Sequence, residues 1–286
     1  MNVLLRRIVR TVTPTPIRRR ARPTVRKARL VASYGGFRRS PRSAIRYILF
    51  DREFDNFTYD IANVADLAAF LASALGGDRA VHRIHLDELG RDAPLARLLR
   101  QRLSGKADRN RVMPFGRRLG WYAVARWLKP RLIVETGVHD GLGSIALLRA
   151  LERNEQDGSP GELLSFEVDP SAGWLIPEAL RSRHTIVVGN SLEQIPAAVS
   201  DRGVTLFIHD SDHRREHEAA EFELIAPYLV PGAAVISDNS HSTTALAEFS
   251  QRHGLRYSFW REVPVRHFYP GAGIGLGVVP GTDGMP

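Results

Sequence analysis

Oxygen-bearing side chains follow two apolar runs of this sequence, and their types and spacing suit a hard metal ion. Asp210 follows the run Thr205–His209, and Asp238 and Asn239 follow the run Ala233–Ser237. The two aspartates are 28 residues apart, the length of one strand-helix-strand crossover, so neighbouring parallel strands would present both carboxylates at one end of the sheet. Two carboxylates and an amide oxygen suit Mg²⁺ or another hard divalent cation, with water and substrate completing the octahedron. We therefore expect these three residues to bind Mg²⁺.

A glycine-rich turn follows an earlier apolar run, Leu132–Thr136. Residues 135–144 read ETGVHDGLGS, and a helical pattern comes next. Glycine allows the backbone to approach a ligand closely, with φ values that other residues resist. The spacing G-x-x-x-G-x-G differs from the G-x-G-x-x-G that places a pyrophosphate at a helix N-terminus. It favours a cofactor whose ribose, rather than a diphosphate, crosses the loop.

Residues after the next two apolar runs extend this cofactor pattern. Glu167 ends the second run, where a carboxylate can accept both hydroxyl groups of a ribose, as in dinucleotide-binding folds. A helix cap or a solvated acid is the alternative for Glu167. Gly189 and Ser191 follow the third run, where an adenine edge would lie, and Ser191 also begins a capping-box pattern with Gln194. Together these residues predict an adenosine-containing cofactor.

Seven short apolar runs alternate with helical patterns from Leu132 onward. The expected strands are Leu132–Thr136, Leu163–Val168, Thr185–Val188, Thr205–His209, Ala233–Ser237, Leu255–Phe259 and Ala272–Val278. The expected helices are Ser144–Glu152, Leu175–Arg181, Glu193–Ser200, Glu216–Leu229 and Thr243–Arg252. Strands that are apolar on both faces, in a βαβα order, predict an α/β fold with a doubly wound, Rossmann-like, mostly parallel seven-stranded sheet. Ligands of such sheets bind beyond the carboxyl ends of the strands.

The chain divides into three expected parts. Residues 1–50 form a basic, partly disordered arm, residues 51–130 a helical cap or substrate region, and residues 131–286 the cofactor-binding domain. Within the middle part, helical spacing predicts helices at about 61–71, ending at Gly76 and Gly77, at Ala93–Leu103 and at Gly120–Leu128. These helices either complete the packing or form a lid over a substrate.

Positive charge is concentrated in the arm. The first 50 residues contain 14 Arg or Lys and no acid, so the net charge of +9 leaves the other 236 residues at −5. The arm reads as a solvated tail, a surface anchor for anionic lipid, or an organelle presequence. We expect it to affect location rather than chemistry.

Composition also excludes several classes of site. The absence of cysteine excludes disulfides, thiolate metal sites and cysteine nucleophiles. No stretch offers the ~18 uninterrupted apolar residues that a membrane-spanning helix needs, and no secretory signal is evident. We expect a cytoplasmic protein, peripheral to the membrane if the arm binds lipid. Homo-oligomerisation is left open.

The segment from about Leu132 to Val279 resembles class I S-adenosylmethionine-dependent methyltransferases, and most of all the metal-dependent O-methyltransferases. These include catechol O-methyltransferase and the macrolide-sugar O-methyltransferases. The family's acid-x-Gly motif, ribose-binding acid and Gly-x-Ser motif match residues 135–137, 167 and 189–191. The resemblance implies S-adenosylmethionine as cofactor, bound by Glu135, Gly137, Gly141, Ser144, Glu167, Gly189, Ser191 and Asp210.

The same resemblance implies how a hydroxyl group would be methylated. The family's Asp, Asp and Asn ligands match the predicted trio, and their cation lowers the pKa of a bound hydroxyl and orients it toward the methyl group. His213 lies where the catechol enzymes carry a lysine and some sugar enzymes a histidine, which implies a general base. Asp212 is the alternative base. The four-residue spacing of His209, His213 and His217 leaves a zinc site as an alternative interpretation.

The predicted function is Mg²⁺-dependent O-methylation of a sugar or glycan hydroxyl group. A phenolic or polyketide acceptor is the main alternative. A nucleic-acid methyltransferase is less favoured because the body of the chain is acidic. A non-catalytic, membrane-associated binding protein of the same fold is disfavoured by the intact metal trio.

Overall fold

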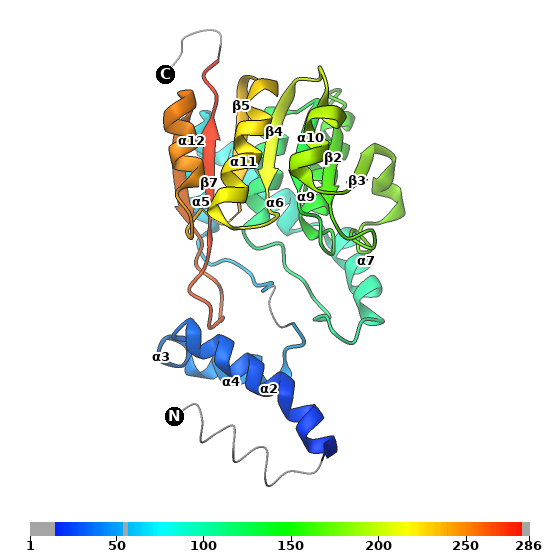
Figure 1. The fold of residues 1–286 in the computed structure, drawn as a ribbon, viewed down its shortest axis with the longest axis vertical. Coiled ribbons are helices and arrows are strands. Elements are labelled where there is room, and N and C mark those ends of the chain that lie inside the picture. The colour runs from blue at the N-terminus through cyan, green and yellow to red at the C-terminus, as the bar shows by residue number, and fades with distance from the viewer. Residues whose placement is uncertain (1–14, 54–56, 239, 282–286) are drawn as a thin grey trace.

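The computed structural model describes the backbone of residues 15–53, 57–238 and 240–281, and the side chains of these residues except 15–22. A seven-stranded sheet has the order β3-β2-β1-β4-β5-β7-β6 (Figure 1). β7 is antiparallel to β5 and β6, and the other pairs are parallel. The strands are β1 (Leu132–Thr136), β2 (Glu162–Glu167), β3 (His184–Val188), β4 (Val204–His209), β5 (Leu229–Ser237), β6 (Arg256–Arg261) and β7 (Gly273–Val278). The predicted doubly wound fold is confirmed.

Helices cover both faces of the sheet, which explains why its inner strands are apolar throughout. In β1, Ile133 belongs to one core, whereas Leu132 and Val134 belong to the other. The helices on the Ile133 face are α5 (Val64–Leu75), α6 (Arg79–Gly90), α7 (Ala93–Ser104), α8 (Arg118–Leu128) and α9 (Leu142–Gln156). Those on the other face are α10 (Ser191–Val199), α11 (Arg215–Ile225) and α12 (Ala245–His253).

Two helical segments differ from the prediction. α6 was not predicted, because His82 occupies a fully buried position on its inner face and interrupts the apolar repeat. The predicted helix Leu175–Arg181 is wrong. Only a 3₁₀ helix, η1 (Glu178–Arg183), forms there, preceded by Pro177, which has no N–H to donate to an α-helical hydrogen bond.

Three helices occupy most of the arm that composition suggested was partly disordered; its first 14 residues lie outside the described residues. They lie beyond the sheet edge where the parallel strands end, and the β6–β7 connection reaches them (Figure 1). Val31, Ala44 and Tyr47 pack with Phe268 of that connection in a third, small core. The helices of this N-terminal cap are α2 (Thr15–Ser33), α3 (Gly36–Arg39) and α4 (Pro41–Phe50). Apolar burial against Phe268 therefore orders part of a strongly basic segment.

A search of the described residues finds no helix whose length and apolar character would let it cross a bilayer.

Candidate active site

Two cavities adjoin at the carboxyl ends of the parallel strands, where a doubly wound fold binds its ligands. The glutamate cavity, about 580 Å³, includes Glu167 in its lining. The arginine cavity, about 490 Å³, includes Arg117 and Arg118. The residues that line both are Gly137, His139, Asp210 and Ser211. A ligand in one cavity can therefore reach a ligand in the other.

Glu167 is held as an anion where β2 ends. Its Oε2 accepts hydrogen bonds from the backbone N–H groups of Val138 and His139, each at 2.9 Å. Its Oε1 accepts from Val168 at 2.7 Å and Asp169 at 3.1 Å. Burial alone would raise the pKa of Glu167, but these four N–H groups bring it below its ordinary value. A carboxylate has about four acceptor sites, so ribose hydroxyls would share oxygens that already bind the backbone.

Gly137 allows the two cavities to meet. Its φ is +84°, and a Cβ there would lie 2.1 Å from the carbonyl oxygen of Asp210. Only glycine lets the loop lie this close to the end of β4. Gly189 and Ser191 also line the glutamate cavity. Five of the predicted cofactor residues, Glu167 and Asp210 included, therefore come together at the cavities.

The other three predicted cofactor residues belong to the glycine-rich turn itself and are not among those lining either cavity. Glu135 is buried and accepts hydrogen bonds from the hydroxyls of Ser144, at 2.6 Å, and Ser165, at 2.8 Å. Burial raises the pKa of Glu135 to about 7. Gly141, with φ +98°, packs against Ile176. These residues shape the loop rather than face a ligand.

Ser191 has a different local role from the one its capping-box pattern suggested. Asn190 is the N-cap of α10, so the predicted box starting at Ser191 is wrong. The Ser191 hydroxyl instead donates to Glu221 of α11. His209 Nδ1 and His217 Nε2 lie 2.7 and 3.0 Å from the same carboxylate. Among the described side chains, no group of three or more His, Cys, Asp or Glu is arranged to hold a metal ion, so the zinc alternative gains no support.

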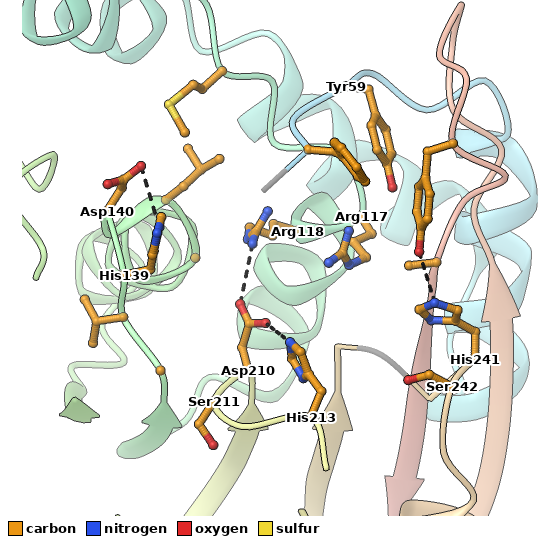
Figure 2. A pocket seen from close by; sticks show the side chains of 18 of the residues that line it. Tyr59, Arg117, Arg118, His139, Asp140, Asp210, Ser211, His213, His241 and Ser242 are labelled. Atoms are coloured by element: carbon orange, nitrogen blue, oxygen red, sulfur yellow. Dashed lines mark hydrogen bonds and ion pairs between the residues drawn. The ribbon is translucent and has the colours of Figure 1, made fainter. Parts of the chain in front are cut away.

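The two predicted bases lie in different cavities. His213 lines the arginine cavity, with Nε2 3.8 Å from Oδ1 of Asp210 (Figure 2). Burial lowers the pKa of His213 below its ordinary value, which keeps the imidazole neutral near pH 7. Asp212 lines the glutamate cavity instead, and its ion pair with Arg214, at 2.6 Å, lowers its pKa to about 2. The geometry favours His213 as the proton acceptor for a group in the arginine cavity.

Each of the two predicted metal-binding aspartates faces an arginine. Asp238 is completely buried, and its two oxygens accept hydrogen bonds from Nε of Arg117, at 2.8 Å, and from Nη2. Nη2 of Arg118 lies 3.4 Å from Oδ2 of Asp210 (Figure 2). Burial alone would raise the pKa of Asp238, but Arg117 lowers it to about 2, whereas burial and the Asp238 charge raise the pKa of Asp210. Asn239 lies outside the described residues.

This arrangement does not fit a resident Mg²⁺. An ion between Asp210 and Asp238 would compete with a bidentate guanidinium for the oxygens of Asp238. It would also lie beside two guanidinium groups, which repel a dication strongly in a buried site. Mg²⁺ requires nearly ideal octahedral geometry from oxygens that are free to turn toward it. Arg117 already supplies the positive charge that the Asp238 carboxylate needs.

The two arginines differ in how firmly they are held. Nη1 of Arg117 lies 3.5 Å from Oε1 of the buried Glu262, which also accepts hydrogen bonds from the Tyr59 hydroxyl and from the N–H of Ala272, at 2.7 Å. Nε of Arg118 is buried and has no hydrogen-bond partner within the described part of the chain. Arg117 is therefore fixed on both sides, whereas Arg118 is held by its longer contact with Asp210 and lines the arginine cavity.

Aromatic side chains from distant segments form part of the wall of the arginine cavity. Tyr34 of the cap, Phe57 and Tyr269 line it, and the ring centroids of Tyr34 and Tyr269 lie 4.8 Å apart. Nε2 of His241 lies 3.0 Å from the Tyr269 hydroxyl (Figure 2). Sequence reasoning missed these aromatic residues and both arginines, because no motif links them to the strand ends. The position of Tyr34 also departs from the expectation that the arm affects location alone.

Comparison with known proteins finds a match to methyltransferases over part of the chain. A family model described as a methyltransferase domain matches residues 134–240. Similar solved structures include the O-methyltransferase TomG from Streptomyces achromogenes (17% identity, 76% of this chain, 96% of that chain, TM-score 0.46). Others are a putative O-methyltransferase from Klebsiella pneumoniae (18%, 75%, 96%, 0.48) and an O-methyltransferase from Bacillus cereus (16%, 75%, 97%, 0.45). No curated protein matches the chain. The domain match confirms the predicted resemblance to methyltransferases over residues 134–240.

Proposed function

We propose that this chain, which carries a methyltransferase domain at residues 134–240, transfers a methyl group from S-adenosylmethionine to a hydroxyl group of its acceptor. The observation that carries the proposal is the meeting of the two cavities at Gly137 and Asp210. One cavity holds a carboxylate suited to a ribose, and the other holds a neutral imidazole suited to a hydroxyl proton.

The glutamate cavity suits the methyl donor. Its volume of about 580 Å³ is large enough for an adenosine, and the lowered pKa of Glu167 keeps its carboxylate negatively charged at neutral pH. When bound, S-adenosylmethionine supplies an activated methyl group on a sulfonium sulfur. Gly137 lets the backbone pass close to the ligand at the boundary with the arginine cavity. Gly189 and Ser191 complete the side where the adenine would lie.

The arginine cavity suits an acceptor hydroxyl group. We assign the general base to Nε2 of His213, which takes the hydroxyl proton as the oxygen bonds to the methyl carbon and the carbon–sulfur electron pair stays on sulfur. Arg118 lines the arginine cavity, so its guanidinium can orient the acceptor oxygen and stabilise its developing negative charge. Arg117 keeps Asp238 charged and fixed behind this site.

The predicted Mg²⁺ takes no part in this proposal, because the residues around Asp210 and Asp238 do not fit it. The positive charge beside the acceptor comes from Arg117 and Arg118 instead. A guanidinium orients an oxygen through fixed N–H groups, as a cation does through coordination, and His213 removes the hydroxyl proton. The proposal is therefore a metal-independent O-methyltransferase.

A sugar or glycan is the proposed acceptor, with a phenolic or polyketide metabolite as the second candidate. The rings of Tyr34, Phe57 and Tyr269 offer flat apolar surfaces to either compound. The histidine at residue 213 matches the sugar-modifying branch of the family, which supports the sugar. Incubation of the enzyme with methyl-labelled S-adenosylmethionine and panels of glycosides and phenols tests the choice. Label in the glycosides supports it, and label confined to phenols supports the second candidate.

A further inference from the structure

The outer face of α4 exposes large apolar side chains. The exposed fractions are 52% for Ile45, 61% for Leu49 and 75% for Phe50. Arg42 and Arg46 are exposed on the same helix. At about 100° per residue these five positions fall within one half of the helix circumference, and the opposite half packs into the core of the cap. An apolar group of this kind on a soluble surface indicates an interaction site.

The charge around this face indicates the nature of its partner. Residues 23–50, whose side chains are described, contain seven Arg or Lys and no acid. The identical face of a second copy would bring like charges together, which opposes a symmetric dimer. A polyanionic surface with an apolar interior suits both the arginines and the apolar centre. Anionic bilayers have this combination, and helices that lie in their interface show the same pattern.

We propose that the cap docks on an anionic lipid bilayer through the α4 face, defined as Arg42, Ile45, Arg46, Leu49 and Phe50. The three apolar side chains enter the boundary between headgroups and acyl chains, and the two arginines bind lipid phosphates. The inference rests on exposure and charge and does not depend on the proposed function. Because the same cap places Tyr34 in the wall of the arginine cavity, docking would hold this cavity close to the bilayer.

Vesicle flotation of the full chain tests the proposal without donor or acceptor. The vesicles contain phosphatidylcholine alone or phosphatidylcholine with phosphatidylserine. The apolar variant is Leu49→Ser with Phe50→Ser, and its control is Ile84→Ser, an equally exposed apolar residue on α6. The charge variant is Arg42→Gln with Arg46→Gln, and its control is Arg97→Gln with Arg100→Gln on α7. All substituted side chains are exposed, so thermal melts should match the unsubstituted protein.

The expected result is binding to vesicles that contain phosphatidylserine, weakened by salt. Each α4 variant should lose about tenfold or more of its vesicle affinity, and both controls should keep it. Three outcomes would overturn the proposal: no vesicle binding by the unsubstituted protein, equal losses in the controls, or full binding by both α4 variants. A fourth outcome would also overturn the proposal. If the unsubstituted protein is a dimer in size-exclusion chromatography and the variant Leu49→Ser with Phe50→Ser is a monomer, a second copy covers the α4 face.

Discussion

The glutamate and arginine cavities lie side by side, but they are assembled in different ways. Glu167, Gly189 and Ser191 come from strand ends and follow directly from short motifs. Arg117 comes from the segment before the methyltransferase domain, and Tyr34 comes from the N-terminal cap. The domain motif therefore accounts for the proposed donor side. The proposed acceptor side depends on segments that the fold recruits from outside the domain.

This difference changes the chemistry at two residues that the motif had identified. Asp210 and Asp238 occupy the strand ends at which the resemblance predicted them, yet the charges they face belong to Arg117 and Arg118. The motif correctly predicted where these two carboxyl groups lie. Whether such a group binds a metal ion or a guanidinium depends on the side chains that surround it.

The largest expected effect is on turnover, and it tests which cavity holds the base. His213→Ala should lower turnover by about 10²–10⁴-fold while leaving S-adenosylmethionine binding unchanged. Asp212→Ala is the matched control, and it should stay within a few-fold of the unsubstituted enzyme because Asp212 faces the other cavity and pairs with Arg214. Single-turnover rates and calorimetric titration measure both quantities. The reverse pattern, with Asp212→Ala inactive and His213→Ala active, would move the base to the glutamate cavity.

Removing Arg117 should lower the free energy of unfolding of the protein. Arg117→Ala leaves Asp238 buried without its partner, a change that costs on the order of 3–5 kcal/mol in the free energy of unfolding. Arg117 holds the pKa of Asp238 at about 2, below its unfolded value, so its stabilisation is present at neutral pH. It is lost as pH falls from about 4 toward about 2. The difference between the two proteins should therefore shrink in acid, and a pH-independent difference would contradict the ion pair.

Substitution of Glu167 in the glutamate cavity should weaken the binding of S-adenosylmethionine. Glu167→Ala should lose about 1–3 kcal/mol of S-adenosylmethionine binding, because a charge-assisted acceptor is removed and the glycine loop loses its anchor. Glu162→Ala, at the opposite end of β2, is the control and should bind normally. Isothermal titration measures both. Tighter binding of a nicotinamide dinucleotide than of S-adenosylmethionine would refute the assignment of this cavity.

A smaller effect is expected where the cap meets the acceptor. Tyr34→Ala removes a ring that packs on Tyr269, and it should raise the KM for the acceptor about 2- to 10-fold with little change in donor binding. Phe37→Ala, exposed on α3, is the control. If neither substitution changes the KM, the cap does not belong to the acceptor site.

Much of the fold was predictable because strands buried on both faces must be apolar at every position, and β1 shows this at residues 132–134. Glycine positions were also informative, since Gly137 is required by its φ and by its contact with Asp210. Helix α6 was harder to predict, because a histidine with a hydrogen bond to a carbonyl oxygen replaces an apolar residue at position 82. Sequence patterns therefore predict an element well where its position requires one kind of residue, such as an apolar residue in a buried strand or a glycine at positive φ.

The charges of the arginine cavity could not be predicted, because they depend on pairing across long stretches of chain. Arg117 and Asp238 are 121 residues apart, and no spacing rule connects them. A clue was present in Arg117 and Arg118, two adjacent arginines just before the predicted helix Gly120–Leu128. A buried arginine requires an acidic partner, but the sequence contains many acidic residues and does not indicate which of them pairs with it.

The most direct test of the account is the metal dependence of methyl transfer. The enzyme should be prepared with EDTA, shown to be metal-free by elemental analysis, and assayed with S-adenosylmethionine and an acceptor from the glycoside or phenol panels. Because Arg117 and Arg118 supply the positive charge, turnover should be unchanged by EDTA and by added Mg²⁺. Loss of turnover with EDTA and its recovery with Mg²⁺ would contradict the account and restore Asp210, Asp238 and Asn239 as metal ligands.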